Sequence, residues 1–364
     1  MGLDLNVPVQ SVIHFNIAGF ALLPELMPKD LFGKQLLRSI DAALLSAQME
    51  YHLRSRAFLQ DEYRLGSLCD PCFSNITSSN GSWNDYLQWE QKLSTKERVR
   101  RIATAREALQ CCLQQGRQAC ASSQGGSCGG RLPRLPGYLA LNLHRYSDRI
   151  YKLASGPRLA AVAAALLQEP QVRLYQTTVV VKEPGTTSNS AVEWHQDLAL
   201  VPFDTNQYLT IWCPFRRGLR SAANDSLVHF AKRSHKDLAR LVHRFDDHGL
   251  SDEFVRARYD VTHAEELRIG GCTAHHGWTL HSSSLQPDMT KARSAITFSF
   301  VAANARTIPR EMFRPDEERA DWDVWVRDVV WDAPVAESKM PLVWPRPAAE
   351  GVTLSLSNSA SDEL

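Results

Sequence analysis

The chain has 364 residues, of which 44% are hydrophobic and 22% are charged, the balance of an ordinary globular protein. Its 41 basic and 40 acidic residues leave almost no net charge, so neither a nucleic acid nor an anionic surface is expected as a partner. No apolar stretch reaches the roughly 18 to 20 residues of a spanning helix, so membrane insertion is not expected either.

The first predicted elements lie in residues 12–54. A strand is predicted over residues 12–23, and after Pro24 a helix is predicted because apolar residues recur at helical spacing. These are Leu31, Leu36, Leu37, Ile40 and Leu44.

Residues 55–135 have a different character and are interpreted as a Cys/Ser-rich insertion. The segment holds six of the eight cysteines: Cys69, Cys72, Cys111, Cys112, Cys120 and Cys128. Adjacent Cys111 and Cys112 lack the spacing of a zinc site, so free thiols are favoured. Disulfides there would require an oxidising compartment.

The remaining chain reads as helices followed by strands. Residues 136–171 are predicted to form a helical layer, and short β runs follow at 172–182, 192–200, 208–213, 227–230, 273–280 and 294–302. This order predicts a β-sandwich or barrel with helices on one face. Residues 172–305 would be the barrel core, and a Trp-rich extension, residues 306–345, would pack back on it. Residues 1–345 are thus expected to be one domain, with a flexible tail at 346–364.

A histidine and an aspartate near the centre of the barrel core indicate a metal site. His195 and Asp197 lie two apart on a predicted strand, so their side chains are expected on the same face. A third ligand must come from elsewhere, and the segment 270–284 offers His275, His276 and His281. Two histidines and one carboxylate, with the other positions open, are the ligand set of Fe(II) oxygenases.

The order of the motifs resembles the phytanoyl-CoA dioxygenase family of Fe(II)/2-oxoglutarate oxygenases. The resemblance covers roughly residues 12–52 and 140–305, and it is carried by residues 174–185, 194–197, 208–212, 226–235, 271–281 and Arg293. It implies a mainly β fold with flanking helices: a double-stranded β-helix, which is a jelly-roll or cupin-like barrel, with Fe(II), 2-oxoglutarate and O2 inside.

Four residues match the functional positions of that family. His195, Asp197 and His281 correspond to the metal ligands, because the family's distal histidine is followed by small residues and then by an arginine. Here that arginine is Arg293, which would bind the distal carboxylate of 2-oxoglutarate. His276 is too far from Arg293 for the pattern and is expected to support a ligand or fill the core.

Other family positions are matched less specifically. Trp212, Thr178 and Asn142 match positions around the cosubstrate, although each is equally consistent with core or strand packing. Ser234 and His235 are expected to fix a loop in which Lys232 and Arg233 replace a Pro-Gly pair. In a separate Gly-Asp turn of the family pattern, Gly271 replaces the acidic residue. These departures concern loops and leave the metal ligands intact.

The resemblance implies a dioxygenase that hydroxylates or otherwise oxidises a small organic substrate and releases succinate and CO2. Asp197 argues against halogenation, in which Gly or Ala would replace the carboxylate. The substrate, whether acyl-CoA, amino acid or natural product, and the oligomeric state stay open. Two alternatives also stay open: a non-catalytic barrel that acts as a scaffold or binding module, and a cupin-like metalloenzyme that does not use 2-oxoglutarate.

The two ends of the sequence give conflicting indications of compartment. The first residues lack a basic segment followed by an apolar one, so a cytoplasmic location is the default expectation. The last four residues, Ser-Asp-Glu-Leu, are close to the ER-retention signal, which would act only if a leader preceded the sequence.

Overall fold

The computed structural model describes eleven stretches of the chain. They are residues 7–28, 31–41, 43–44, 139–182, 192–216, 226–237, 250–264, 267–284, 293–309, 330–335 and 340–345. The predicted insertion at 55–135 and the tail at 346–364 lie outside them, as do the six cysteines of the insertion, Trp322 and Trp325.

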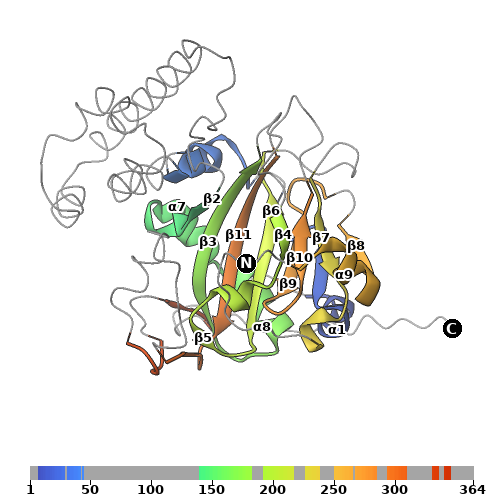
Figure 1. The fold of residues 1–364 in the computed structure, drawn as a ribbon. Coiled ribbons are helices and arrows are strands. Elements are labelled where there is room, and N and C mark those ends of the chain that lie inside the picture. The colour runs from blue at the N-terminus through green and yellow to red at the C-terminus, as the bar shows by residue number, and fades with distance from the viewer. Residues whose placement is uncertain are drawn as a thin grey trace, which may run out of the picture.

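The elements follow one another as helices and then mostly strands (Figure 1). In order they are α1 (Val9–Ala18), β1 (Phe20–Leu23), β2 (Leu139–Leu141), the 3-10 turn η1 (Leu143–Arg145), α7 (Asp148–Ala154), α8 (Pro157–Leu167), β3 (Val172–Lys182), β4 (Val192–His195), η2 (Asp197–Leu200), β5 (Phe203–Asp204), β6 (Tyr208–Pro214), β7 (Val228–Ala231), η3 (Ser234–Lys236), α9 (Asp252–Arg258), β8 (Val261–His263), β9 (Cys272–His276), β10 (His281–Ser283), β11 (Arg293–Ala302), β12 (Arg306–Thr307) and β13 (Leu342–Trp344).

Two antiparallel sheets form the body of the domain. The large sheet has the order β1-β9-β6-β11-β3-β13, with β2 also paired to β3, and the small sheet has the order β4-β10-β7-β8. Most neighbours in these sheets are not consecutive in sequence, as expected when a chain wraps between two sheets of a jelly roll. The predicted fold class, a mainly β barrel with flanking helices, is confirmed.

The two faces of the large sheet differ in chemistry because side chains alternate along each strand. Val179, Ile296 and Phe298 lie on one face and belong to the main core, together with most of α8. Their neighbours Thr178 and Thr297 lie on the opposite face. Each fully buried aliphatic or aromatic side chain contributes roughly 1.5 to 3 kcal/mol, so the helix-covered face contributes strongly to stability. The inner face combines polar side chains with a smaller apolar cluster that includes Trp212 and Ala295.

The helical layer is built mainly from α8, which packs on β3, β6, β11 and β13. Pro157 begins the helix, and Gln168 ends it with a left-handed conformation. Contrary to expectation, the stretch Asp148–Leu167 is long and apolar enough to cross a membrane. It consists of α7 and α8, and eight residues of α8 are buried in the domain, so its apolar composition serves the core.

The predicted strand over residues 12–23 is wrong in its first part, which forms α1. Phe15 and Ala18 are buried on one side of this helix, while Ile13 and Ile17 are exposed. Gly19 then adopts φ 89° and donates to the Phe15 carbonyl, which ends the helix and begins β1. A short apolar run does not distinguish a helix from a strand. The predicted helix that follows is present at 34–41 and 43–44.

The longer strands were predicted well and the shorter ones less so. The runs 172–182, 208–213 and 294–302 correspond to β3, β6 and β11. The run 192–200 is only half strand, because η2 begins at Asp197, and the run 273–280 is β9 followed by a turn. Trp344 of the C-terminal extension lies on β13, which pairs with β3.

A disulfide joins Cys213 and Cys272 on the neighbouring strands β6 and β9. Both residues are fully buried and belong to the main core, on the helix-covered face of the large sheet. The cysteine pattern did not predict this bond, since the two cysteines are 59 residues apart and only the strand pairing brings them together.

Candidate metal centre

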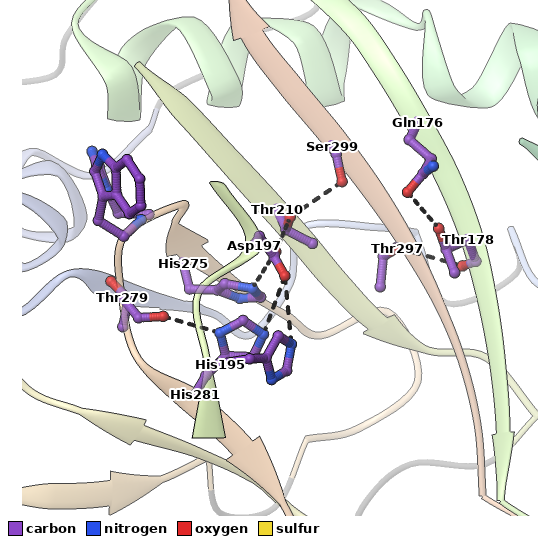
Figure 2. Close-up of polar contacts among 12 residues, drawn as sticks. Gln176, Thr178, His195, Asp197, Thr210, His275, Thr279, His281, Thr297 and Ser299 are labelled. Carbon is purple, nitrogen blue, oxygen red and sulfur yellow. Dashed lines mark hydrogen bonds and ion pairs between the residues drawn. The ribbon is translucent and has the colours of Figure 1, made fainter. Parts of the chain in front are cut away.

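His195, Asp197 and His281 meet between the two sheets. Each offers one ligand atom, and these atoms all lie within 4.8 Å of one another. Asp197 Oδ1 is 3.6 Å from His195 Nε2 and 3.5 Å from His281 Nε2. Figure 2 shows the two imidazole rings and the carboxylate directed at one point, so they are placed to hold one metal ion from one side.

The two histidines are brought together by strand pairing. His195 ends β4, and its register partner on β10 is His281. Cross-strand partners have Cβ atoms about 4.5 to 5.5 Å apart, and here the ring centroids are 4.1 Å apart.

Asp197 reaches the same point from a turn. It opens the 3-10 helix η2, so the expectation that both H-x-D side chains project from one strand is wrong for Asp197. The turn is fixed by Leu198 N, which donates to the Gly277 carbonyl at 3.0 Å. A Cβ on Gly277 would lie 2.8 Å from Tyr208 Cδ1, so this close approach requires glycine.

Backbone carbonyls orient both imidazoles. Nδ1 of His195 lies 2.8 Å from the Glu193 carbonyl, and Nδ1 of His281 lies 3.0 Å from the Thr279 carbonyl. With Nδ1–H donating to a carbonyl, the Nε2 lone pair is left to face the metal position. Burial, and then the neighbouring histidines, lower the pKa of His281 well below its usual range, which favours the neutral form that a metal requires.

The carboxylate of Asp197 is also oriented. Its Oδ2 accepts hydrogen bonds from Thr210 Oγ1 at 2.7 Å and from His275 Nε2 at 3.2 Å, while Oδ1 faces the two histidines. Burial by itself would raise the pKa of this carboxyl, but His281 and then His275 hold it below its usual range. Asp197 is therefore ionised and presents one oxygen to the metal position.

Of the two histidines on β9, the supporting contact is made by His275 (Figure 2). Side chains alternate across the strand, so His276 faces the other way, near the rings of Phe15 and His235. Burial lowers the pKa of His276 to about 4. His276 thus does not support a ligand. Counting alternate residues from Thr273 would have placed His275 on the inner face.

Of the predicted cosubstrate residues, Arg293, Trp212 and Thr178 are buried on strands of the large sheet, whereas Asn142 lies in a turn. Arg293, at the start of β11, is 2% exposed, and its guanidinium carbon lies 5.1 Å from the ring centroid of Trp212. Thr178 is buried on β3, where its Oγ1 donates to Gln176 Oε1 at 3.2 Å. Asn142 instead begins η1 with φ 58°, and its carbonyl accepts from Arg145 N. Its described role is that of a turn residue.

The loop after β7 is fixed by Ser234, as expected. Ser234 Oγ donates to the Ala231 carbonyl and accepts from Leu280 N, both at 2.8 Å, which fixes the backbone next to His281. Arg233 adopts φ 70°, a conformation that favours glycine, at the position where the family pattern has Gly.

The residues present fit a divalent metal with an anionic organic ligand. Two imidazole nitrogens and one carboxylate oxygen are the donor set of Fe(II) oxygenases. Among the described residues, Thr273 Oγ1 and His275 Nδ1 are buried without a hydrogen-bond partner. Both belong to inner-face residues of β9, and buried polar atoms usually have partners. An anionic ligand between the sheets would accept a hydrogen bond from Thr273 Oγ1, whereas His275 Nδ1, whose ring donates to Asp197 through Nε2, would need a donor from elsewhere.

Comparisons with known proteins agree with this description. The non-heme alpha ketoglutarate dependent epimerase SnoN from nogalamycin biosynthesis superposes with a TM-score of 0.53 at 16% identity, covering 94% of this chain and 98% of SnoN. The carbocyclase SnoK from the same biosynthesis also gives 0.53, at 14% identity, covering 94% of this chain and 99% of SnoK. SnoN has been crystallised with Fe3+, alpha ketoglutarate and nogalamycin RO. At such identities the likeness shows the fold alone.

No curated protein sequence matches the chain. The family model described as phytanoyl-CoA dioxygenase (PhyH) matches residues 139–285, which include His195, Asp197 and His281. The resemblance seen in the motifs is therefore confirmed for this part of the chain.

Proposed function

We propose that the protein is an Fe(II)- and 2-oxoglutarate-dependent dioxygenase that hydroxylates or otherwise oxidises a small organic substrate, with release of succinate and CO2. The observation that carries this proposal is the convergence of His195, Asp197 and His281 between the two sheets, together with Arg293, which is buried on the inner face of the large sheet.

Each residue has a defined part in this proposal. His195, Asp197 and His281 would hold Fe(II) from one side and leave its other positions open. Bound Fe(II), together with 2-oxoglutarate and O2, supplies the oxidising chemistry. Arg293 would bind the distal carboxylate with its planar fork, and the Trp212 ring beneath it keeps the guanidinium in place.

The competing functions are less well supported. A scaffold would not need the hydrogen bonds that orient His195, His281 and both oxygens of Asp197. A cupin-like metalloenzyme without 2-oxoglutarate would not need Arg293 on the inner face. SnoN is described as an epimerase and SnoK as a carbocyclase, so product analysis has to decide between hydroxylation and another oxidative outcome.

The test is an anaerobic titration of the full chain with Fe(II) and then 2-oxoglutarate, monitored through the visible charge-transfer band of a 2-oxo acid chelated to ferrous iron. We expect the band in the wild type and its loss in His195→Ala and Arg293→Leu. His263→Ala, a half-buried histidine on β8, is the matched control and should retain it. Iron binding without the band would favour the cupin-like alternative, and no iron binding would favour the scaffold.

A further inference from the structure

A second buried cation lies next to Arg293. Lys182 ends β3 and is the register partner of Arg293 on β11, so the two side chains are on the same face of the sheet. Lys182 is 3% exposed and Arg293 is 2% exposed. Lysine and arginine are almost never buried unless their charge is compensated.

The hydrogen bonds of Lys182 do not compensate its charge. Its Nζ donates to Ser226 Oγ at 2.8 Å, to Ser283 Oγ at 2.8 Å and to the Ser284 carbonyl at 2.7 Å. All three acceptors are neutral, so they satisfy the three donors of the protonated form and give it no counter-charge, while the neutral amine has only two N–H groups to donate to them.

These contacts also locate Lys182 relative to the metal centre. Ser283 follows His281 by two residues on β10, which places both side chains on the same face of that strand. Lys182 therefore reaches from the large sheet to the small sheet, close to the metal ligands.

We propose that Lys182 is a second cation of the subsite that binds the distal carboxylate of the 2-oxo acid, acting beside Arg293. This inference rests on the proposed function. Since the three donors of Lys182 already have acceptors, Lys182 acts on the carboxylate through its charge, while Arg293 supplies the directional hydrogen bonds. Lys182 is thus a residue that sets affinity and specificity for a dicarboxylic 2-oxo acid.

The protonation of Lys182 should then depend on the ligand. Burial, and then the charge of Arg293, lower the pKa of Lys182 to about 6. The other titratable group described near it is His229 on β7, whose own pKa is lowered by burial and in small part by Lys182. At neutral pH the ligand-free lysine is mostly neutral, and a bound carboxylate would raise its pKa and draw a proton onto it.

The first test is calorimetric binding to the metal-free full chain, with 2-oxoglutarate and with 2-oxopentanoate, which lacks the distal carboxylate. Lys182→Met should weaken 2-oxoglutarate binding about 10- to 100-fold, as expected for a lost charge at close range. Binding of 2-oxopentanoate should be nearly unchanged. Lys232→Met, at a lysine that pairs with Asp260 on the surface, should behave as the wild type.

The outcomes separate this inference from the proposed function. If Lys182→Met binds 2-oxoglutarate as tightly as the wild type, or loses both ligands equally, the inference is overturned, while a charge-transfer band in the wild type keeps the proposed function. If the wild type binds no 2-oxoglutarate, with or without Fe(II), both are overturned.

The second test needs no variant and covers the case in which Lys182→Met does not fold. Binding enthalpies of 2-oxoglutarate are measured at pH 7.5 in buffers of different ionisation enthalpy, which gives the number of protons taken up. The wild type should take up a large fraction of one proton, because Lys182 becomes charged on binding. Binding without proton uptake would overturn the proposal.

Discussion

Replacing Lys182 with methionine is expected to stabilise the ligand-free protein. In the folded state the pKa of this lysine is about 6, against 10.5 for an ordinary lysine. At pH 7 an ordinary lysine is charged and Lys182 is largely neutral. Folding therefore includes the cost of deprotonation, which the methionine variant does not have.

The magnitude follows from the two pKa values. Deprotonating an ordinary lysine at pH 7 costs about 1.4 kcal/mol for each of about 3.5 pH units, or roughly 5 kcal/mol as an upper limit. Methionine removes the donor to Ser226, Ser283 and the Ser284 carbonyl, which costs about 0.5 to 1.5 kcal/mol for each of the three bonds. We expect a net stabilisation of roughly 0.5 to 3.5 kcal/mol at pH 7.

The lowered pKa of Lys182 determines the direction in which the stability of the wild type changes with pH. Between pH 6 and pH 10.5 the unfolded chain keeps a proton on Lys182 that the folded protein has released, so the stability of the wild type rises with pH across this window. The advantage of Lys182→Met is therefore largest below pH 6 and disappears toward pH 10.5.

The assay is urea denaturation of the metal-free wild type, Lys182→Met and the control Lys232→Met at several pH values from 6 to 9. A difference between Lys182→Met and the wild type that does not shrink as the pH rises would refute the reasoning. A destabilised Lys182→Met would show that the three hydrogen bonds outweigh the cost of the buried amine.

Three further changes test the metal centre. Asp197→Ala should abolish substrate oxidation, measured as product and succinate formation, and an active hydroxylase with this change would contradict the ligand assignment. His275→Phe removes one of the two described hydrogen bonds to Oδ2 of Asp197 and leaves the one from Thr210. Fe(II) binding, measured by equilibrium dialysis, should weaken about 10- to 100-fold. An unchanged affinity would mean that His275 contributes to packing and does not support the ligand. Gly277→Ala brings a Cβ to 2.8 Å from Tyr208 Cδ1 and should cost roughly 1 to 3 kcal/mol in urea denaturation, whereas full stability would show that the turn can shift freely.

The strands that could be predicted from the sequence are those with long runs of β-forming residues. β3 and β11 are eleven and ten residues long, and runs of that length rich in β-branched and aromatic residues do not fit another structure. The region of α1 and β1 was not predictable, because an apolar run of twelve residues suits both elements and the break at Gly19 depends on its backbone angle. The cross-strand disulfide was also missed, since it depends on which strands are neighbours.

The sequence alone named only the candidate metal ligands and the arginine proposed to bind the cosubstrate. His195, Asp197, His281 and Arg293 stand in short local patterns whose chemistry restricts the residue types. Lys182 stands in no such pattern, because its neighbours come from β7, β10 and β11. For supporting residues of this kind, the signal in the sequence is their position on the strand, because alternate residues face the interior of the barrel. This signal can be used once the order of the strands in the sheet is known.

The pairing of His195 with His281 gives a bound metal a mechanical role. β4 is the edge strand of the small sheet and is only four residues long. Besides its pairing with β10, the described backbone pairing of β4 is one isolated bridge from Trp194 to Leu250, so few backbone hydrogen bonds hold it. A metal ion bound by one histidine from each strand would cross-link β4 to β10, because β4 could separate from β10 only if the metal lost a ligand. Metal loss and edge opening then become a single equilibrium, and slower amide hydrogen exchange in β4 would report that the metal site is filled.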